Sequence, residues 1–377
     1  MAQALLRAMT GRRQDEEHRA ATPLELFFDL CFVVAVAQAG TALHHAVGEG
    51  HVAHGVGAYL MVFFAIWWAW MNFTWFASAY DTDDVPYRLA VLVQITGSLI
   101  MAAGVTRAFD REDFTVIVIG YVVMRLAQIA QWLRAAASHP ARRATALRYA
   151  AGLFAVQVLW VSLLFVPSGW RTAAWVVFAL ADLSVPAFAE RAGSTSWHPH
   201  HIAERYGLFT IIVLGESVTA ATLAFKDAFD VHVTAALLTT LVGGILIMFS
   251  LWWLYFGKDA APRLTGSRAA FVWGYGHYVV FAAGAAVGAG LSVAAAHAVH
   301  EGHAGRLLSS AAVTVPTAVF LLMIYLLHRE GGRGAVLITT ACALVLASTF
   351  VPGSVLVTGA VLAGVVALTQ VERSPAS

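Results

Sequence analysis

The sequence predicts an all-α integral membrane protein with about twelve transmembrane helices, and three observations support this fold class. First, 59% of the 377 residues are hydrophobic and only 12% are charged, whereas soluble domains carry about 25% charged residues. Second, the apolar residues form runs of roughly 18 to 31 residues, and about 20 residues of helix cross a bilayer. Third, Lys and Arg gather in alternate loops, as in multi-pass membrane proteins.

Twelve apolar runs have spanning or near-spanning length. They cover residues 23–46, 53–79, 86–109, 114–136, 145–166, 172–190, 202–225, 231–257, 269–299, 307–328, 334–351 and 354–371. The last two are short and share a break at Pro352-Gly353, so a re-entrant pair is an alternative to two spans there. Residues 1–22 form a polar tail that we expect to be mobile or to lie on the membrane surface, and residues 372–377 form a second short tail.

The distribution of positive charge predicts that both termini are cytoplasmic. With the N-terminus inside, 16 Lys and Arg residues fall in cytoplasmic segments and 5 in external loops, and positive residues are enriched on the cytoplasmic side. The net charge of +1 gives no indication of a nucleic-acid partner. Cys31 and Cys342 both lie in apolar runs, so we interpret them as small buried hydrophobic residues rather than a disulfide or a metal pair.

The two halves of the chain also resemble each other. Three matches share an offset of about 180 residues: Glu25 with Glu204, Trp67 with Trp252, and residues 88–104 with 268–284. Because each half contains six helices, an even number, residues 23–190 and 202–371 are expected to be parallel repeats. Such repeats are related by an axis along the membrane normal. The alternative is chance similarity between apolar helices.

Polar motifs open the first and the seventh apolar runs. Residues 22–30 read TPLELFFDL, and residues 204–217 read ERYGLFTIIVLGES. These motifs resemble those of the bacterial low temperature requirement protein A family, and the hydrophobic pattern extends the resemblance over essentially the whole chain. The resemblance implies a multi-pass protein of the bacterial inner membrane, and it does not imply a reaction.

Ionisable side chains within the predicted spans are the main candidates for function, because a charge in hydrocarbon is costly. The acids are Glu25, Asp29, Asp182, Glu204 and Glu216, and the bases are Arg125 and Arg205, with His277 as a third candidate. Five carboxylates cannot all be charged and paired with two permanent cations, so some should be protonated or bind a cation. The alternative is a set of polar contacts that hold helices together, which suits Glu25 and Glu204 near their helix ends.

Helical spacing groups several of these candidates. Glu25 and Asp29 are four residues apart and share a face, where they repel unless a cation or a proton lies between them. Arg205 and Glu216 are separated by 11 residues, which places them within roughly 20° around the helix axis. The seventh helix is therefore expected to present one polar face.

A polar stripe on the fourth helix must face the bundle interior. It contains Tyr121, Arg125, Gln128 and Trp132, and Gln38 on the first helix is a further interior candidate. Because Arg125 cannot lose its charge in a protein, it needs a carboxylate partner. Glu216 is our first choice for that partner, and Asp182 is the second.

Three histidines precede the seventh helix. His198, His200 and His201 could bind zinc together with Glu204, but no second set of ligands stands at a suitable spacing. We therefore interpret them as interfacial residues and predict no metal site. No cofactor can be named from the sequence.

These features favour a secondary transporter or permease for a small solute, with the intramembrane carboxylates as a route for proton coupling. One alternative is a membrane-embedded enzyme that acts on a lipid-soluble substrate, which is less favoured because no catalytic motif is present. Another is a non-transporting membrane protein in low-temperature adaptation, which only the family resemblance suggests. The expected partners are the lipid bilayer and a small solute or a proton. The sequence does not decide whether the protein forms a homo-oligomer.

Overall fold

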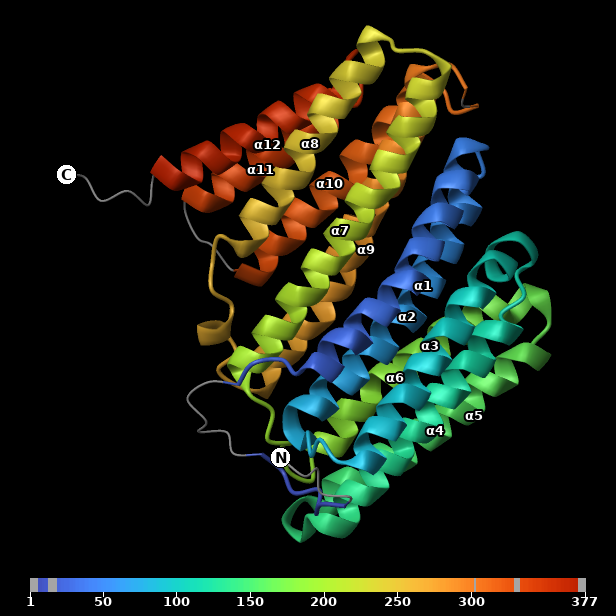
Figure 1. The fold of residues 1–377 in the computed structure, drawn as a ribbon, viewed down its shortest axis with the longest axis vertical. Helices are drawn as coiled ribbons and strands as arrows, with labels where there is room; N and C mark the ends of the chain where they lie inside the picture. The colour runs from blue at the N-terminus through green and yellow to red at the C-terminus, as the bar shows by residue number, and fades with distance from the viewer. Residues whose placement is uncertain (1–5, 13–18, 302, 329–332, 372–377) are drawn as a thin grey trace. The chain divides into compact units, whose positions relative to one another are not determined.

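A computed structural model describes residues 6–12, 19–301, 303–328 and 333–371, and this part of the chain forms twelve α-helices and no strand. The helices, shown in Figure 1, are α1 (Pro23–Gly48), α2 (Val52–Tyr80), α3 (Val85–Arg111), α4 (Thr115–Ser138), α5 (Arg143–Ser162), α6 (Ser168–Glu190), α7 (Pro199–Val231), α8 (Ala235–Phe256), α9 (Ser267–Ala298), α10 (Arg306–His328), α11 (Arg333–Ser348) and α12 (Ser354–Val371). Each helix corresponds to one predicted apolar run, so the all-α class is confirmed.

Eleven helices among the described residues are long and apolar enough to cross a membrane. The remaining one, α11, has 16 residues and falls short of that length. Between α11 and α12 lies Gly353 with φ of +70°, a left-handed conformation that glycine adopts without a Cβ clash. The break between the last two helices is therefore confirmed, and their re-entrant arrangement stays a prediction.

Helix α7 is longer than the sequence indicated. We expected residues 202–225, whereas the helix contains 33 residues and covers Pro199–Val231. Pro199 is the first residue of the helix, because the first turn does not need the N–H that proline lacks. At the other end, Lys226 Nζ lies 3.3 Å from Asp230 Oδ2 one turn later, and such pairs support an exposed helical end.

The chain divides into two compact units. The first unit comprises Met1–Ala35 and Ala65–Arg205, and the second comprises Val36–Phe64 and Tyr206–Ser377. This division differs from the sequence halves 23–190 and 202–371, because parts of α1 and α2 group with the later helices. The parallel repeat and the cytoplasmic position of the termini stay predictions.

In the first unit, α3 packs on α4, α4 on α5, and α5 on α6. Glycine allows the closest of these approaches, since a Cβ added at Gly120 would lie 2.5 Å from the carbonyl oxygen of Gly97. Small residues at helix crossings are typical of membrane proteins, where backbones approach closely. The rings of Trp132 and Tyr149 stack with centroids 4.1 Å apart and join α4 to α5.

In the second unit, α9 packs on α10, α10 on α11, and α12 on both α8 and α11. A Cβ added at Gly243 on α8 would lie 2.5 Å from the backbone nitrogen of Leu356 on α12, so glycine is again required at the crossing. Helix α9 is the core of this unit, because most of its residues are buried.

Candidate functional site

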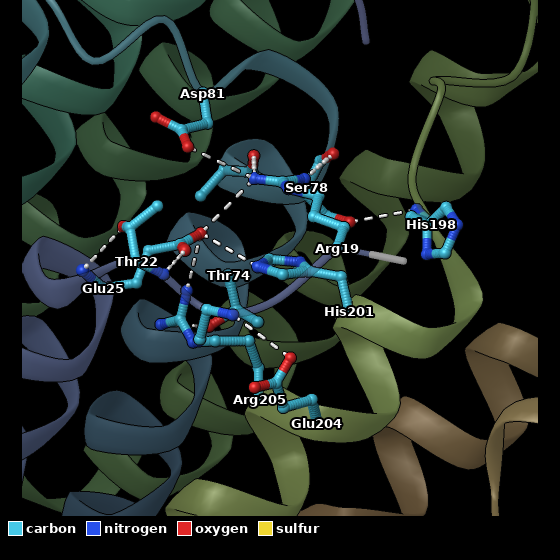
Figure 2. A network of polar contacts seen from close by, with 12 residues as sticks. Arg19, Thr22, Glu25, Thr74, Ser78, Asp81, His198, His201, Glu204 and Arg205 are labelled. Atoms are coloured by element: carbon cyan, nitrogen blue, oxygen red, sulfur yellow. Dashed lines mark hydrogen bonds and ion pairs between the residues drawn. The ribbon is translucent and has the colours of Figure 1, made fainter. Parts of the chain in front are cut away.

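The start of α1 is fixed by a capping box. The Glu25 N–H donates to Thr22 Oγ1 at 3.3 Å, and the Thr22 N–H donates to Glu25 Oε2 at 2.7 Å. The pattern Thr-x-x-Glu favours this reciprocal pair at a helix N-terminus. The cap occupies one carboxylate oxygen of Glu25 and leaves Oε1 facing cations from other segments (Figure 2).

Arg205 lies between the two acids of α1. Its Nη1 is 3.1 Å from Glu25 Oε1, while Nη2 and Nε donate to the two oxygens of Asp29 at 2.6 and 3.0 Å. The contact with Asp29 is the forked geometry that makes arginine–carboxylate pairs strong. All three residues are buried. The expected repulsion between Glu25 and Asp29 is thus relieved by a cation.

Helix α2 completes the surroundings of Asp29 and Arg205. Trp70 Nε1 donates to Asp29 Oδ1 at 2.6 Å, and Arg205 Nη2 lies 3.4 Å from the Thr74 hydroxyl. The Thr74 hydroxyl in turn donates to the Trp70 carbonyl at 2.9 Å. Each oxygen of Asp29 therefore has a donor, which is what a buried carboxylate requires.

Three further groups extend this site away from α1. Arg19 Nη2 lies 3.6 Å from Glu25 Oε1 and 3.6 Å from Asp81 Oδ2 (Figure 2), and its guanidinium also donates to two backbone carbonyls near the end of α2. His201 Nε2 lies 3.1 Å from Glu25 Oε1. We call the set Arg19, Glu25, Asp29, Asp81, His201 and Arg205 the buried charge network.

Asp81 also contacts a cation outside the buried charge network. The network contains three carboxylates and two guanidiniums, and Arg12 Nη1 lies 3.7 Å from Asp81 Oδ2, so a third guanidinium balances the third acid. Asp81 follows the last residue of α2, and its side chain is 5% exposed. Burial, reinforced by the Glu25 carboxylate, raises the pKa of Asp81 to about 6 against the opposing effect of Arg19 and Arg12. The arrangement can therefore bind and release a proton near neutral pH.

A second buried ion pair joins α4 to α6. Arg125 Nη2 lies 2.8 and 2.9 Å from the two oxygens of Asp182. The Tyr121 hydroxyl and Trp160 Nε1 also donate to Asp182 Oδ2, at 3.2 and 2.9 Å. The positive charge of Arg125 therefore balances the negative charge of Asp182.

The partner of Arg125 is therefore Asp182, and our first choice of Glu216 was wrong. Sequence depth places both acids at a similar level but does not say which helix packs beside α4. The packing of α4 on α5 and of α5 on α6 brings Asp182 to Arg125. Glu216 is half-buried in the second unit, where no hydrogen bond or ion pair from a described residue reaches its carboxylate.

The other expected site residues have separate surroundings. Gln128 is buried on α4, and neither of its amide atoms has a partner among the described residues. Glu204 is half-buried, and its Oε2 accepts from the Ala21 N–H at 3.1 Å. Gln38 is exposed, contrary to the expected interior position, because the buried stripe of α1 runs through Val36 and Ala39 instead.

His277 lies in an aromatic environment in the second unit. Its Nδ1 is 2.7 Å from the Trp273 carbonyl, and its Nε2 is 2.9 Å from the Tyr255 hydroxyl. Since a carbonyl only accepts, Nδ1 carries a proton and donates to the Trp273 carbonyl. In a neutral ring, Nε2 then accepts from the Tyr255 hydroxyl.

Sequence reasoning missed part of the buried charge network. Arg19 was assigned to a surface tail but is buried, and Asp81 lies outside the predicted spans. His201 was interpreted as interfacial, although it stands four residues before Arg205 and so shares its helical face. The Thr-x-x-Glu pattern at Thr22 was a usable signal for the geometry around Glu25.

Comparison with known proteins shows the family of the chain. The family model described as "Bacterial low temperature requirement A protein" matches residues 20–371, a range that includes both polar motifs. The chain is also similar to the protein named "Uncharacterized protein RA0937" of Rhizobium meliloti (strain 1021). The two are 27% identical over 286 residues, which cover 71% of this chain and 67% of that protein. The chain therefore belongs to the bacterial low temperature requirement A protein family.

Proposed function

We propose that this membrane protein is a secondary transporter or permease for a small solute in the bacterial inner membrane, and that it couples transport to protons. The observation that carries the proposal is that Asp81, whose pKa burial raises to about 6, contacts the buried charges near the start of α1 through Arg19. An acid that titrates near neutral pH beside fixed buried charges gives the network two charge states in the physiological pH range.

The order of groups supports a proton route. Asp81, Arg19, Glu25, Arg205 and Asp29 alternate in charge, and neighbouring charged atoms are separated by 3.6, 3.6, 3.1 and 2.6 Å. Asp81 lies just beyond the end of α2, whereas Asp29 lies one turn further into α1 than Glu25. A proton taken up at Asp81 therefore changes the charge balance experienced by groups within the spans.

Such a change can alter the contact between Arg205 and α1. When Asp81 is charged, it shares Arg19 with Glu25. When Asp81 is protonated, Arg19 interacts with Glu25 alone. The attraction between Glu25 and Arg205 then weakens relative to the attraction between Asp29 and Arg205. Proton binding then favours one set of ion pairs over another, which is the differential interaction that a switch requires.

The Arg125–Asp182 pair has a different role in this proposal. Its charges balance, and Tyr121 and Trp160 supply further hydrogen bonds to the carboxylate. We propose that this pair holds α4 and α6 in place and that it takes no part in proton transfer.

The membrane-embedded enzyme is the second candidate. It requires a carboxylate and a histidine acting as acid and base, and His201 Nε2 lies 3.1 Å from Glu25 Oε1 in the buried charge network.

The proposal is tested with purified protein in vesicles that contain a trapped pH-sensitive dye. Panels of amino acids, sugars, organic acids and monovalent cations are added outside, and both solute entry and internal pH are recorded. We expect at least one solute to enter with a simultaneous pH change that empty vesicles lack. Entry without any pH change would contradict proton coupling, and the absence of entry across the panels would contradict transport.

A further inference from the structure

The second unit contains a cavity of about 330 Å³ that the buried charge network does not use. It is lined by residues of α1, α2, α9 and α10, among them Val47, Val56, Tyr59, Ala282, Ala286 and Val315. Its volume lies at the lower end of the range of roughly 300–1,000 Å³ that is usual for small-molecule sites.

The positions of its lining residues make the cavity long. Those on α9 extend from Tyr278 to Val293, and those on α10 from Leu308 to Val319. At ~1.5 Å per helical residue these stretches measure about 22 and 16 Å. A volume of 330 Å³ spread over such a length admits one slender chain rather than a fused ring system.

The residues that line the cavity favour an apolar ligand. No Asp, Glu, Lys or Arg lines the cavity. Its two tyrosine hydroxyls are already used, because Tyr59 donates to the Ala282 carbonyl at 2.7 Å and Tyr278 to the Leu60 carbonyl at 2.8 Å. The remaining polar side chain is His44, which lies one turn before the end of α1.

One wall of the cavity continues onto exposed apolar side chains. Leu60 on α2 is 42% exposed, and Val315 on α10 is 47% exposed. Both lie within helices that are long and apolar enough to cross a membrane. In a bilayer such side chains are surrounded by lipid tails, so a tail can enter from the side without crossing a polar region.

We propose that this cavity binds one acyl chain of a membrane phospholipid, with the headgroup at the His44 end. The length, the absence of charge and the lipid-facing wall all match an acyl chain. A soluble ligand would need polar groups of the protein to fix its orientation. In this cavity the tyrosine hydroxyls already form hydrogen bonds between helices. This site is independent of the proposed transport function.

The first test is phospholipid retention by the purified full-length protein, measured by native mass spectrometry after detergent washing. Ala286→Phe fills the cavity, and Ala236→Phe on the exposed face of α8 is the matched control. We expect wild type and the control to retain about one phospholipid, and Ala286→Phe to retain at least fivefold less. Equal retention in all three proteins, or a bound detergent that phospholipid does not displace, would overturn the proposal.

A second test uses wild-type protein and so does not depend on the folding of a variant. A phospholipid with a photoreactive group midway along one acyl chain is incorporated into the vesicles and activated by light. We expect adducts to concentrate on the cavity residues of α2, α9 and α10. Adducts spread evenly over the lipid-facing residues of all helices would show that the chain has no preferred site.

Discussion

Arg205 Nη2 and Asp29 Oδ1 lie 2.6 Å apart, although 176 residues separate them in the chain. Asp29 belongs to the motif that opens α1, and Arg205 belongs to the motif that opens α7. The two motifs by which the chain resembles its family thus contribute opposite charges to one buried site. This contact explains in physical terms why an acid pair at one helix start accompanies an arginine at another.

The Arg205–Asp29 contact should dominate the stability of the network. Arg205→Gln leaves two buried acids without their main cation, and breaking one partner of a buried pair costs about 3–5 kcal/mol. Asp29→Asn should cost a similar amount because it leaves part of the guanidinium unpaired. The double variant should lose clearly less than the sum of the single losses, as measured by thermal unfolding in detergent. Additive losses would show that the two groups do not interact.

A second double-mutant cycle distinguishes the two candidate partners of Arg125. Arg125→Gln and Asp182→Asn should each destabilise by about 3–5 kcal/mol, and together by much less than the sum. Glu216→Gln serves as the matched control, since its carboxylate has no ion pair with a described residue of the second unit. Its effect should simply add to that of Arg125→Gln. Coupling to Glu216 instead of Asp182 would contradict the pairing described above.

Most of the helical framework was predictable from hydrophobicity alone. Each apolar run became a helix, because backbone polar groups in a bilayer must be satisfied within the segment. The ends were less accurate, as α7 shows: Pro199 fits the first helical turn, and the Lys226–Asp230 pair extends the other end beyond the apolar run.

The site was predictable only in part. Spacing along one helix correctly required a cation or a proton between Glu25 and Asp29, but it could not identify that cation as Arg205. Partners on other helices depend on packing, which is why Asp182 rather than Glu216 meets Arg125. Arg19 and Asp81 were missed because polar segments outside apolar runs carry no hydrophobic signal of burial.

The crossing of α3 and α4 should not tolerate a side chain at Gly120. A methyl group there would lie 2.5 Å from the Gly97 carbonyl oxygen and 2.6 Å from the Met101 nitrogen, so backbone must shift. We expect Gly120→Ala to destabilise the protein by roughly 1–3 kcal/mol, as overpacking does. Gly169→Ala in the first turn of α6 is the control, because nothing lies within 4 Å of its added Cβ. Equal melting temperatures for both variants would contradict the close packing.

Asp84 combines a helix cap with an ion pair, and two substitutions separate these roles. Its carboxylate accepts from the Tyr87 N–H at the start of α3 and from Arg134. Although burial raises its pKa, hydrogen bonds from Arg134 and from the Arg7 and Tyr87 backbone hold the pKa at about 2. The charge therefore stabilises the folded state above about pH 4, and this contribution is lost as the pH falls towards 2.

At neutral pH, Asp84→Asn should lose the charge contribution and keep a cap acceptor. Asp84→Ala should lose a further 0.5–2 kcal/mol or so, the usual contribution of a helix N-cap. Thermal unfolding of both variants measures the difference. Identical losses would mean that the cap contributes nothing beyond the ion pair.

The most direct test of the account is a difference titration of Asp81, because the proposal depends on a network that binds a proton near neutral pH. Burial and the Glu25 carboxylate raise the pKa of Asp81 in the folded protein to about 6. Since the folded pKa lies above the ordinary value for aspartate, the folded state should gain stability as the pH falls from 7.5 to 5. Proton uptake over this range is measured by potentiometry for purified wild type and for Asp81→Asn. We predict about one additional proton per wild-type molecule, with a midpoint near pH 6. A difference curve that is flat above pH 5, with its midpoint near 4, would contradict the central claim.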